Sequence, residues 1–169
     1  MINYLFHIMI PMIVSNVSHI VFVKKNKFSR LTIPISTPLF GANKTWRGFV
    51  VVSTLNGVCF WLINLFFPLF ASLEALIIGA FLGLAYMIFE LPNSFLKRRL
   101  GIASGEVPSQ NAWLFMLLDK CDSTLGVAII SKFIFNFSWF ETLQLFLIGV
   151  LIHVFFSWLL VFLGIKKRF

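Results

Sequence analysis

The sequence predicts an all-α integral membrane protein with five transmembrane helices. Hydrophobic residues make up 59% of the 169 residues, with 22 phenylalanines, and the mean hydropathy is +0.94. Only 12% of the residues are charged, too few for a soluble chain of this length to cover so much apolar surface. Apolar runs long enough to span a bilayer recur along the chain. We therefore expect residues 1–169 to form a single membrane-embedded domain whose core consists of helix–helix contacts.

Local chemistry marks the ends of the five runs. Basic residues follow the first run instead of preceding it, so we expect a retained helix and not a cleaved signal peptide. Pro68 ends the second run, Pro92 is expected to stop the third, and Gly164 follows the last. The predicted spans cover about residues 2–23, 49–67, 73–91, 113–135 and 142–163.

The distribution of basic residues predicts the orientation of the spans. Lysine and arginine gather in links 24–48 and 92–112 and in the tail 166–168. The positive-inside rule places these segments in the cytoplasm, with the N-terminus outside and the C-terminus inside. We expect a multi-pass protein of the cell (inner or plasma) membrane with two long cytoplasmic loops. Anionic lipid headgroups, and not nucleic acid, then explain most of the net charge of +8.

Two acidic residues lie inside the fourth apolar run. Asp119 and Asp122 are three residues apart, so on a helix both side chains project toward one side. Counted from Trp113, they lie roughly 9 and 14 Å into the span. A carboxylate at such a depth costs about 3 kcal/mol, and acids inside membrane helices usually mark a functional site.

Glu90 closes the preceding run at a similar level of the membrane. If it converges with Asp119 and Asp122, the three carboxylates form a hard, oxygen-rich site of the kind that Mg²⁺ prefers. The alternative is that the two aspartates pair with Lys120, Lys132 or Arg98 and serve only to hold helices together.

The loop 40–48 combines glycines, an amide, a hydroxyl and cations just before the second span. Such a loop can direct backbone N–H groups toward an anion, with side-chain charge added. The spacing of a P-loop is absent, so the loop alone is also explained as a positive-inside anchor. The candidate residues are Gly41, Asn43, Lys44, Thr45 and Arg47.

A second basic segment follows Glu90. Lys97 and Arg98 come seven and eight residues after it, close enough for phosphates to bridge a metal ion and these cations. Arginine can hold a phosphate in a bidentate manner, whereas lysine acts as a point charge. The alternative is a basic stop after a membrane helix.

No serine or cysteine nucleophile with a histidine partner can be identified. His19 is the one histidine expected near the cytoplasmic end, where a packing role is favoured. A reaction whose nucleophile is an ionised phosphate needs alignment and charge neutralisation instead of a general base. The carboxylates and cations described above, with a metal ion, can supply this alignment and charge neutralisation.

Three blocks of the sequence form a recognisable set. They are Leu39-Phe40-Gly41-Ala42-Asn43-Lys44-Thr45-Trp46-Arg47-Gly48-Phe49, Ser94-Phe95-Leu96-Lys97-Arg98-Arg99-Leu100-Gly101-Ile102, and Asp119-x-x-Asp122. Together they resemble the CDP-archaeol synthase family and the related phosphatidate cytidylyltransferases. The resemblance implies five membrane helices, Mg²⁺ as cofactor, and transfer of CMP from CTP to a lipid phosphate in phospholipid biosynthesis. Membrane lipids are the other partners expected, and the sequence leaves a homo-oligomer open.

Roles carried over from the resemblance fall on the candidates already named. Glu90, Asp119 and Asp122 are expected to bind Mg²⁺. The phosphates are expected to contact Lys44, Arg47, Lys97 and Arg98, with Gly41, Asn43, Thr45 and Ser94 as backbone or polar contacts. The chain departs from the usual pattern at Glu90, where aspartate is usual, and at Lys120, where glutamine is common. These departures leave the acceptor lipid open, prenyl or acyl.

Two other functions compete with this hypothesis. One is a small carrier or channel that binds a transported cation at Asp119 and Asp122. The other is a catalytically silent relative that binds a lipid or another membrane protein. The carrier leaves the basic loops unexplained, whereas the departure at Glu90 leaves room for the silent relative.

Overall fold

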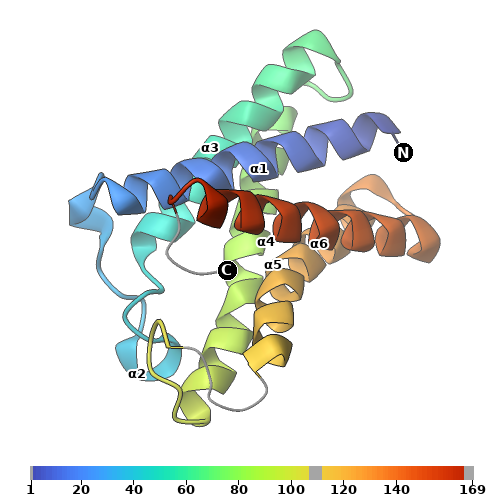
Figure 1. Ribbon diagram of the computed structural model, residues 1–169. Helices are drawn as coiled ribbons and strands as arrows, with labels where there is room; N and C mark the ends of the chain where they lie inside the picture. Colours follow the sequence, from blue (N-terminus) through green and yellow to red (C-terminus); the bar gives the residue numbers. More distant parts are fainter. Residues whose placement is uncertain (1, 107–111, 166–169) are drawn as a thin grey trace.

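The computed structural model describes residues 2–106 and 112–165, and over these ranges the chain is helical, with no β-strand. This confirms the all-α prediction. The elements are α1 (Ile2–Lys24), the short 3-10 helix η1 (Ser29–Leu31), α2 (Thr37–Phe40), α3 (Trp46–Phe66), α4 (Ser72–Arg99), α5 (Ala112–Phe135) and α6 (Trp139–Phe162) (Figure 1).

Four of the described helices, α1, α3, α4 and α6, are long and apolar enough to cross a membrane. They coincide with four of the predicted spans, as expected for an integral membrane protein. The remaining span corresponds to α5, which has 24 residues but carries Asp119, Lys120 and Asp122 near its middle. Its crossing of the membrane stays a prediction. The predicted cytoplasmic tail at 166–168 lies outside the described residues.

The predicted stop at Pro92 is wrong, because α4 continues through this residue to Arg99. Proline removes one helical hydrogen bond and crowds the carbonyl four residues earlier. Packing of α4 against α5 and α2 stabilises the continued helix. The Ser94 hydroxyl also donates to the Glu90 carbonyl at 2.9 Å. The added turns carry Lys97 alongside α5.

Helices α3 and α4 pack closely because glycines line their contact. A methyl group at Gly79 would lie 2.5 Å from the Cβ of Phe60 and 2.9 Å from the carbonyl oxygen of Asn56. The Asn56 amide in turn donates to the Gly79 carbonyl at 2.6 Å. Small residues and side-chain hydrogen bonds are the usual means by which membrane helices associate. The close contact with α3 therefore fixes the position of α4, whose C-terminal end carries the basic residues.

Helices α5 and α6 form an antiparallel hairpin. Ser138 and Glu141 make a capping box at the start of α6, in which the Ser138 hydroxyl accepts from the Glu141 backbone N–H at 3.2 Å. Helix α6 runs beside α1, and Lys24 donates to the Gly164 carbonyl at 2.7 Å (Figure 1). The C-terminal ends of α1 and α6 therefore lie together.

Candidate active site

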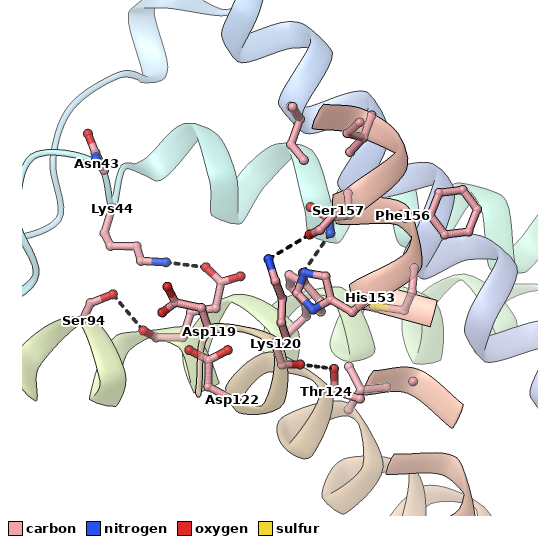
Figure 2. A pocket seen from close by; sticks show the side chains of 18 of the residues that line it. Asn43, Lys44, Ser94, Asp119, Lys120, Asp122, Thr124, His153, Phe156 and Ser157 are labelled. Carbon is pink, nitrogen blue, oxygen red and sulfur yellow. Dashed lines mark hydrogen bonds and ion pairs between the residues drawn. The ribbon is translucent and has the colours of Figure 1, made fainter. Parts of the chain in front are cut away.

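A cavity of about 710 Å³ lies between α1, α4, α5, α6 and the loop that precedes α3. Figure 2 shows its side chains converging from these separate segments. Most of the predicted site residues line it. They are Asn43, Lys44, Glu90, Ser94, Lys97, Arg98, Asp119 and Asp122.

The register between α4 and α5 brings the carboxylates to α4. Gly126 of α5 lies directly against Phe89 of α4, where a methyl group would overlap the ring. Because the helices are antiparallel, one turn from this contact places Asp122 opposite Asn93. The Asn93 amide donates to Asp122 Oδ2 at 2.9 Å. Close backbone approach at Gly126 thus determines which polar side chains meet.

Asn93 connects both aspartates. Its Nδ2 also donates to Asp119 Oδ1 at 2.6 Å, and one turn further along α4 the Lys97 ammonium forms an ion pair with Asp119. The Lys97 side chain is 15% exposed and that of Asp119 44% exposed, so Asp119 lies at the mouth of the cavity. Asp119 and Asp122 therefore share one face of α5, as predicted, and that face meets the amide of Asn93 and the ammonium of Lys97 on α4.

Lys44 enters the cavity from the other side and forms an ion pair with Glu90. The loop that carries it is held by backbone hydrogen bonds, among them Ile35 N–H to the Lys44 carbonyl at 2.9 Å. Burial lowers the pKa of Lys44, but the charge and hydrogen bond of Glu90, with Asp122 and Asp119 beyond, outweigh it. The pKa of Lys44 therefore lies above its ordinary value, and the side chain stays charged.

One observation of the site argues against a bound metal ion and another fits one. Among residues 2–106 and 112–165, no group of three His, Cys, Asp or Glu side chains is placed to hold one. The carboxylates of Glu90 and Asp119 contact lysines instead. The donor chemistry nevertheless fits Mg²⁺, because Asp119 and Asp122 flank Asn93, whose buried Oδ1 accepts no hydrogen bond from the described residues. The ligand set of Glu90, Asp119 and Asp122 stays a prediction.

Three predicted residues, Gly41, Thr45 and Arg47, do not line the cavity. Arg47 is buried and its Nη1 donates to the Lys27 carbonyl at 3.2 Å. Gly41 has φ +84°, and a methyl group there would lie 3.0 Å from Arg98 Nη1. Glycine at this position lets the loop pack against Arg98, so Gly41 supports a cavity residue instead of facing the cavity.

The sequence analysis missed several lining residues. The histidine that lines the cavity is His153 of α6, which the sequence analysis did not identify, whereas His19, for which a packing role is favoured, does not line it. Lys120 is buried, and its ammonium donates to Ser157 at 2.9 Å. His153 and Ser157 are four apart, a spacing that puts both on one face of α6. That spacing within an otherwise apolar helix is the signal that could have identified them.

Comparison with known proteins identifies the family. A family model described as CarS-like CDP-archaeol synthase matches residues 1–169. The chain is 39% identical over 72 residues to a CDP-archaeol synthase of Staphylothermus marinus, an alignment that covers 41% of the chain and 38% of the relative. It is 34% identical over 88 residues to a CDP-archaeol synthase of Pyrococcus furiosus, over 49% of the chain and 51% of the relative.

The alignments thus span about half or less of the length of the curated relatives. No solved structure matches the chain significantly. The family model, in contrast, extends over the whole sequence. The chain belongs to the CDP-archaeol synthase family.

Proposed function

We propose that this protein transfers CMP from CTP to a lipid phosphate, which yields a CDP-activated lipid and pyrophosphate for phospholipid biosynthesis. One observation carries the proposal. In a chain of this family, carboxylates and cations from α4, α5 and the loop before α3 meet in a single cavity that continues into apolar surface. A nucleotide's phosphates and a lipid chain both have matching surfaces there.

The proposal includes five membrane crossings, with the N-terminus outside and the cavity open to the cytoplasm. The hydrogen bond from Lys24 to Gly164 supports it, because it joins the two helix ends that the positive-inside rule places in the cytoplasm. Asp119, at the mouth of the cavity, pairs with Lys97 of the basic segment. The proposed active site therefore lies at the membrane surface.

The proposed reaction is an in-line substitution at the α-phosphorus of CTP. An oxygen of the lipid phosphate forms the new P–O bond, and the bond to the β-phosphate breaks, so that pyrophosphate leaves with the electron pair. The nucleophile is already ionised, so no side chain has to remove a proton. Bound Mg²⁺ would neutralise charge on the phosphates and align them, held by Asp119 and Asp122 with Glu90 as the third expected ligand.

In this proposal the triphosphate binds to three cations of the cavity, Lys44, Lys97 and Arg98. Lys44 and Lys97 are paired with Glu90 and Asp119 in the structure, which keeps their ammonium groups oriented into the cavity. We infer that the phosphates of CTP take over these lysines, while Arg98 adds a planar, bidentate contact. Charge that develops on the leaving pyrophosphate is then matched by fixed positive groups.

The test is an incubation of purified protein with radiolabelled CTP, Mg²⁺ and a panel of diacyl and diprenyl lipid phosphates. We expect a labelled CDP-lipid with at least one acceptor and its loss with EDTA. Lys97→Met should lower the rate about 100-fold, whereas Lys132→Met, on the far end of α5, should not. Absence of product with every acceptor, together with cation flux in liposomes, would establish the carrier function instead.

A further inference from the structure

Lys120 is a buried cation that the proposed handling of the triphosphate leaves without a role. It is 4% exposed and lines the cavity. Its neighbour Asp119 faces α4, but Lys120 follows by about 100° around the helix and turns toward α6. Figure 2 shows its ammonium directed to Ser157, on a different side of the cavity from Lys44.

The packing of α5 on α6 fixes this direction. A methyl group at Gly149 of α6 would overlap the side chain of Thr124, so the two helices touch here. One turn along the antiparallel pair places Lys120 opposite His153, and its long side chain reaches one turn further to Ser157. Thr124 also donates to the Lys120 carbonyl at 2.9 Å, which stabilises this turn of α5.

The cavity that Lys120 lines also offers a surface that suits a lipid. It is walled by apolar side chains of α1, α5 and α6, namely Met9, Met12, Val127, Ile152, Phe156 and Leu160. A cation within such a wall matches a molecule with an anionic head and hydrocarbon chains. A nucleoside triphosphate has no hydrocarbon chain that could extend along this wall.

Charge separation argues for two distinct phosphate sites. Lys44 and Lys97 form ion pairs with carboxylates of α4 and α5, whereas the Lys120 ammonium donates to Ser157 of α6. Two anionic substrates repel one another strongly in a medium of low dielectric constant, so each needs a cation of its own.

We propose that Lys120, positioned by Ser157, binds the phosphate of the acceptor lipid, while Lys44, Lys97 and Arg98 bind the triphosphate. This inference rests on the proposed function and assigns its second substrate to a subsite. An ammonium carries three N–H groups and can hold Ser157 and a phosphate oxygen together. The lipid chains lie along the apolar wall of the cavity.

Equilibrium binding to the purified full-length protein in detergent tests the proposal without turnover. Radiolabelled phosphatidic acid is the probe, and unlabelled diacylglycerol and inorganic phosphate are the competitors. We expect Lys120→Gln to weaken phosphatidic acid binding about tenfold or more and to leave CTP binding within about twofold. Neither competitor should displace the probe at concentrations at which unlabelled phosphatidic acid does. The matched control is Lys132→Gln on the same helix, which should change neither affinity.

Several results would overturn the subsite. They are unchanged phosphatidic acid binding by Lys120→Gln, an equal loss of CTP binding, and equal displacement by diacylglycerol or inorganic phosphate. If Lys120→Gln does not fold, Ser157→Ala takes its place, with an expected loss of about threefold for phosphatidic acid alone; no loss would overturn the proposal. Lys120-dependent binding in a protein that makes no CDP-lipid would refute the proposed reaction but not the subsite.

Discussion

Asn93 is the residue on which Asp119 and Asp122 of α5 depend for their arrangement. One amide donates to both Asp119 and Asp122, at 2.6 and 2.9 Å. Two carboxylates this close repel one another, and the shared donor reduces that repulsion. Asn93 therefore acts as a positioning residue for the carboxylates.

We expect Asn93→Ala to lower CDP-lipid synthesis about 10- to 100-fold, because removal of such a supporting hydrogen bond misplaces the groups that it orients. Raising the Mg²⁺ concentration should restore part of the rate, a response that a general loss of folding would not give. Leu96→Ala, at an exposed position of the same helix, is the control. Full activity of Asn93→Ala at low Mg²⁺ would show that the amide has no such role.

Lys44 offers a test by pH. Its pKa lies above the ordinary lysine value because Glu90 and the aspartates outweigh burial. A raised pKa keeps the charge of Lys44 at every pH below the ordinary lysine value, and the charge is lost only as the pH rises through the raised value. Replacement of Lys44 should therefore have the same effect throughout the neutral range.

We predict that Lys44→Gln raises KM for CTP about tenfold, and that the ratio of wild-type to variant kcat/KM stays constant from about pH 6 to 9. The measurement is the KM for CTP of both proteins across that range. A ratio that falls steadily between pH 7 and 9 would mean that Lys44 loses its proton there, contrary to its environment.

Sequence alone identified the charged residues of the site but not their partners. Asp119 and Asp122 are conspicuous because charge is rare in apolar spans, and Lys44 and Lys97 because they belong to basic links between the spans. Asn93 and Lys120 gain their roles from the register of α5 against α4 and α6. That register depends on close contacts such as Gly126 against Phe89, which no spacing along the chain reveals.

At the scale of the elements, the long helices were predictable and one helix end was not. Apolar length and flanking polar residues gave helix bounds close to those of α1, α3, α5 and α6. The rule that proline ends a helix failed at Pro92 because tertiary packing of α4 stabilises the turns beyond it. Without those turns, Lys97 would not lie beside Asp119.

The α3–α4 contact gives a prediction for stability. Gly79→Ala puts a methyl group against backbone and Cβ atoms of α3, which cannot move aside easily, and should destabilise the protein by about 1–3 kcal/mol. Gly48→Ala is the matched control, because the new methyl would meet the flexible end of Met87 at 2.7 Å. Thermal unfolding in detergent should show a lower midpoint for Gly79→Ala than for Gly48→Ala; equal midpoints would contradict this packing.

For the whole molecule, composition and charge distribution predicted the membrane-protein class and an orientation. They did not predict the cavity, because a cavity depends on how far α1 and α6 stand from α4 and α5. The loop motif and the family resemblance also predicted that Arg47 and Thr45 contact the phosphates, whereas neither residue lines the cavity in the structure. Charge near a site in sequence does not determine which way a side chain points.

The orientation is testable by cysteine labelling. Cys59 and Cys121 are free thiols, so they are first replaced by alanine. Ala71→Cys, in the link predicted to lie outside, should react with a membrane-impermeant maleimide in intact cells. Ser29→Cys, in the predicted cytoplasmic link, should react only after permeabilisation. The opposite pattern would reverse the proposed topology.

The most direct test of the account is CDP-lipid synthesis by Asp119→Asn and Asp122→Asn, each purified as a folded protein and compared with Glu74→Gln at the exposed start of α4. The amide keeps the size of the side chain and removes its charge. The account predicts a loss of about 100-fold or more for each aspartate variant and none for the control. Synthesis at the wild-type rate by either aspartate variant would contradict it.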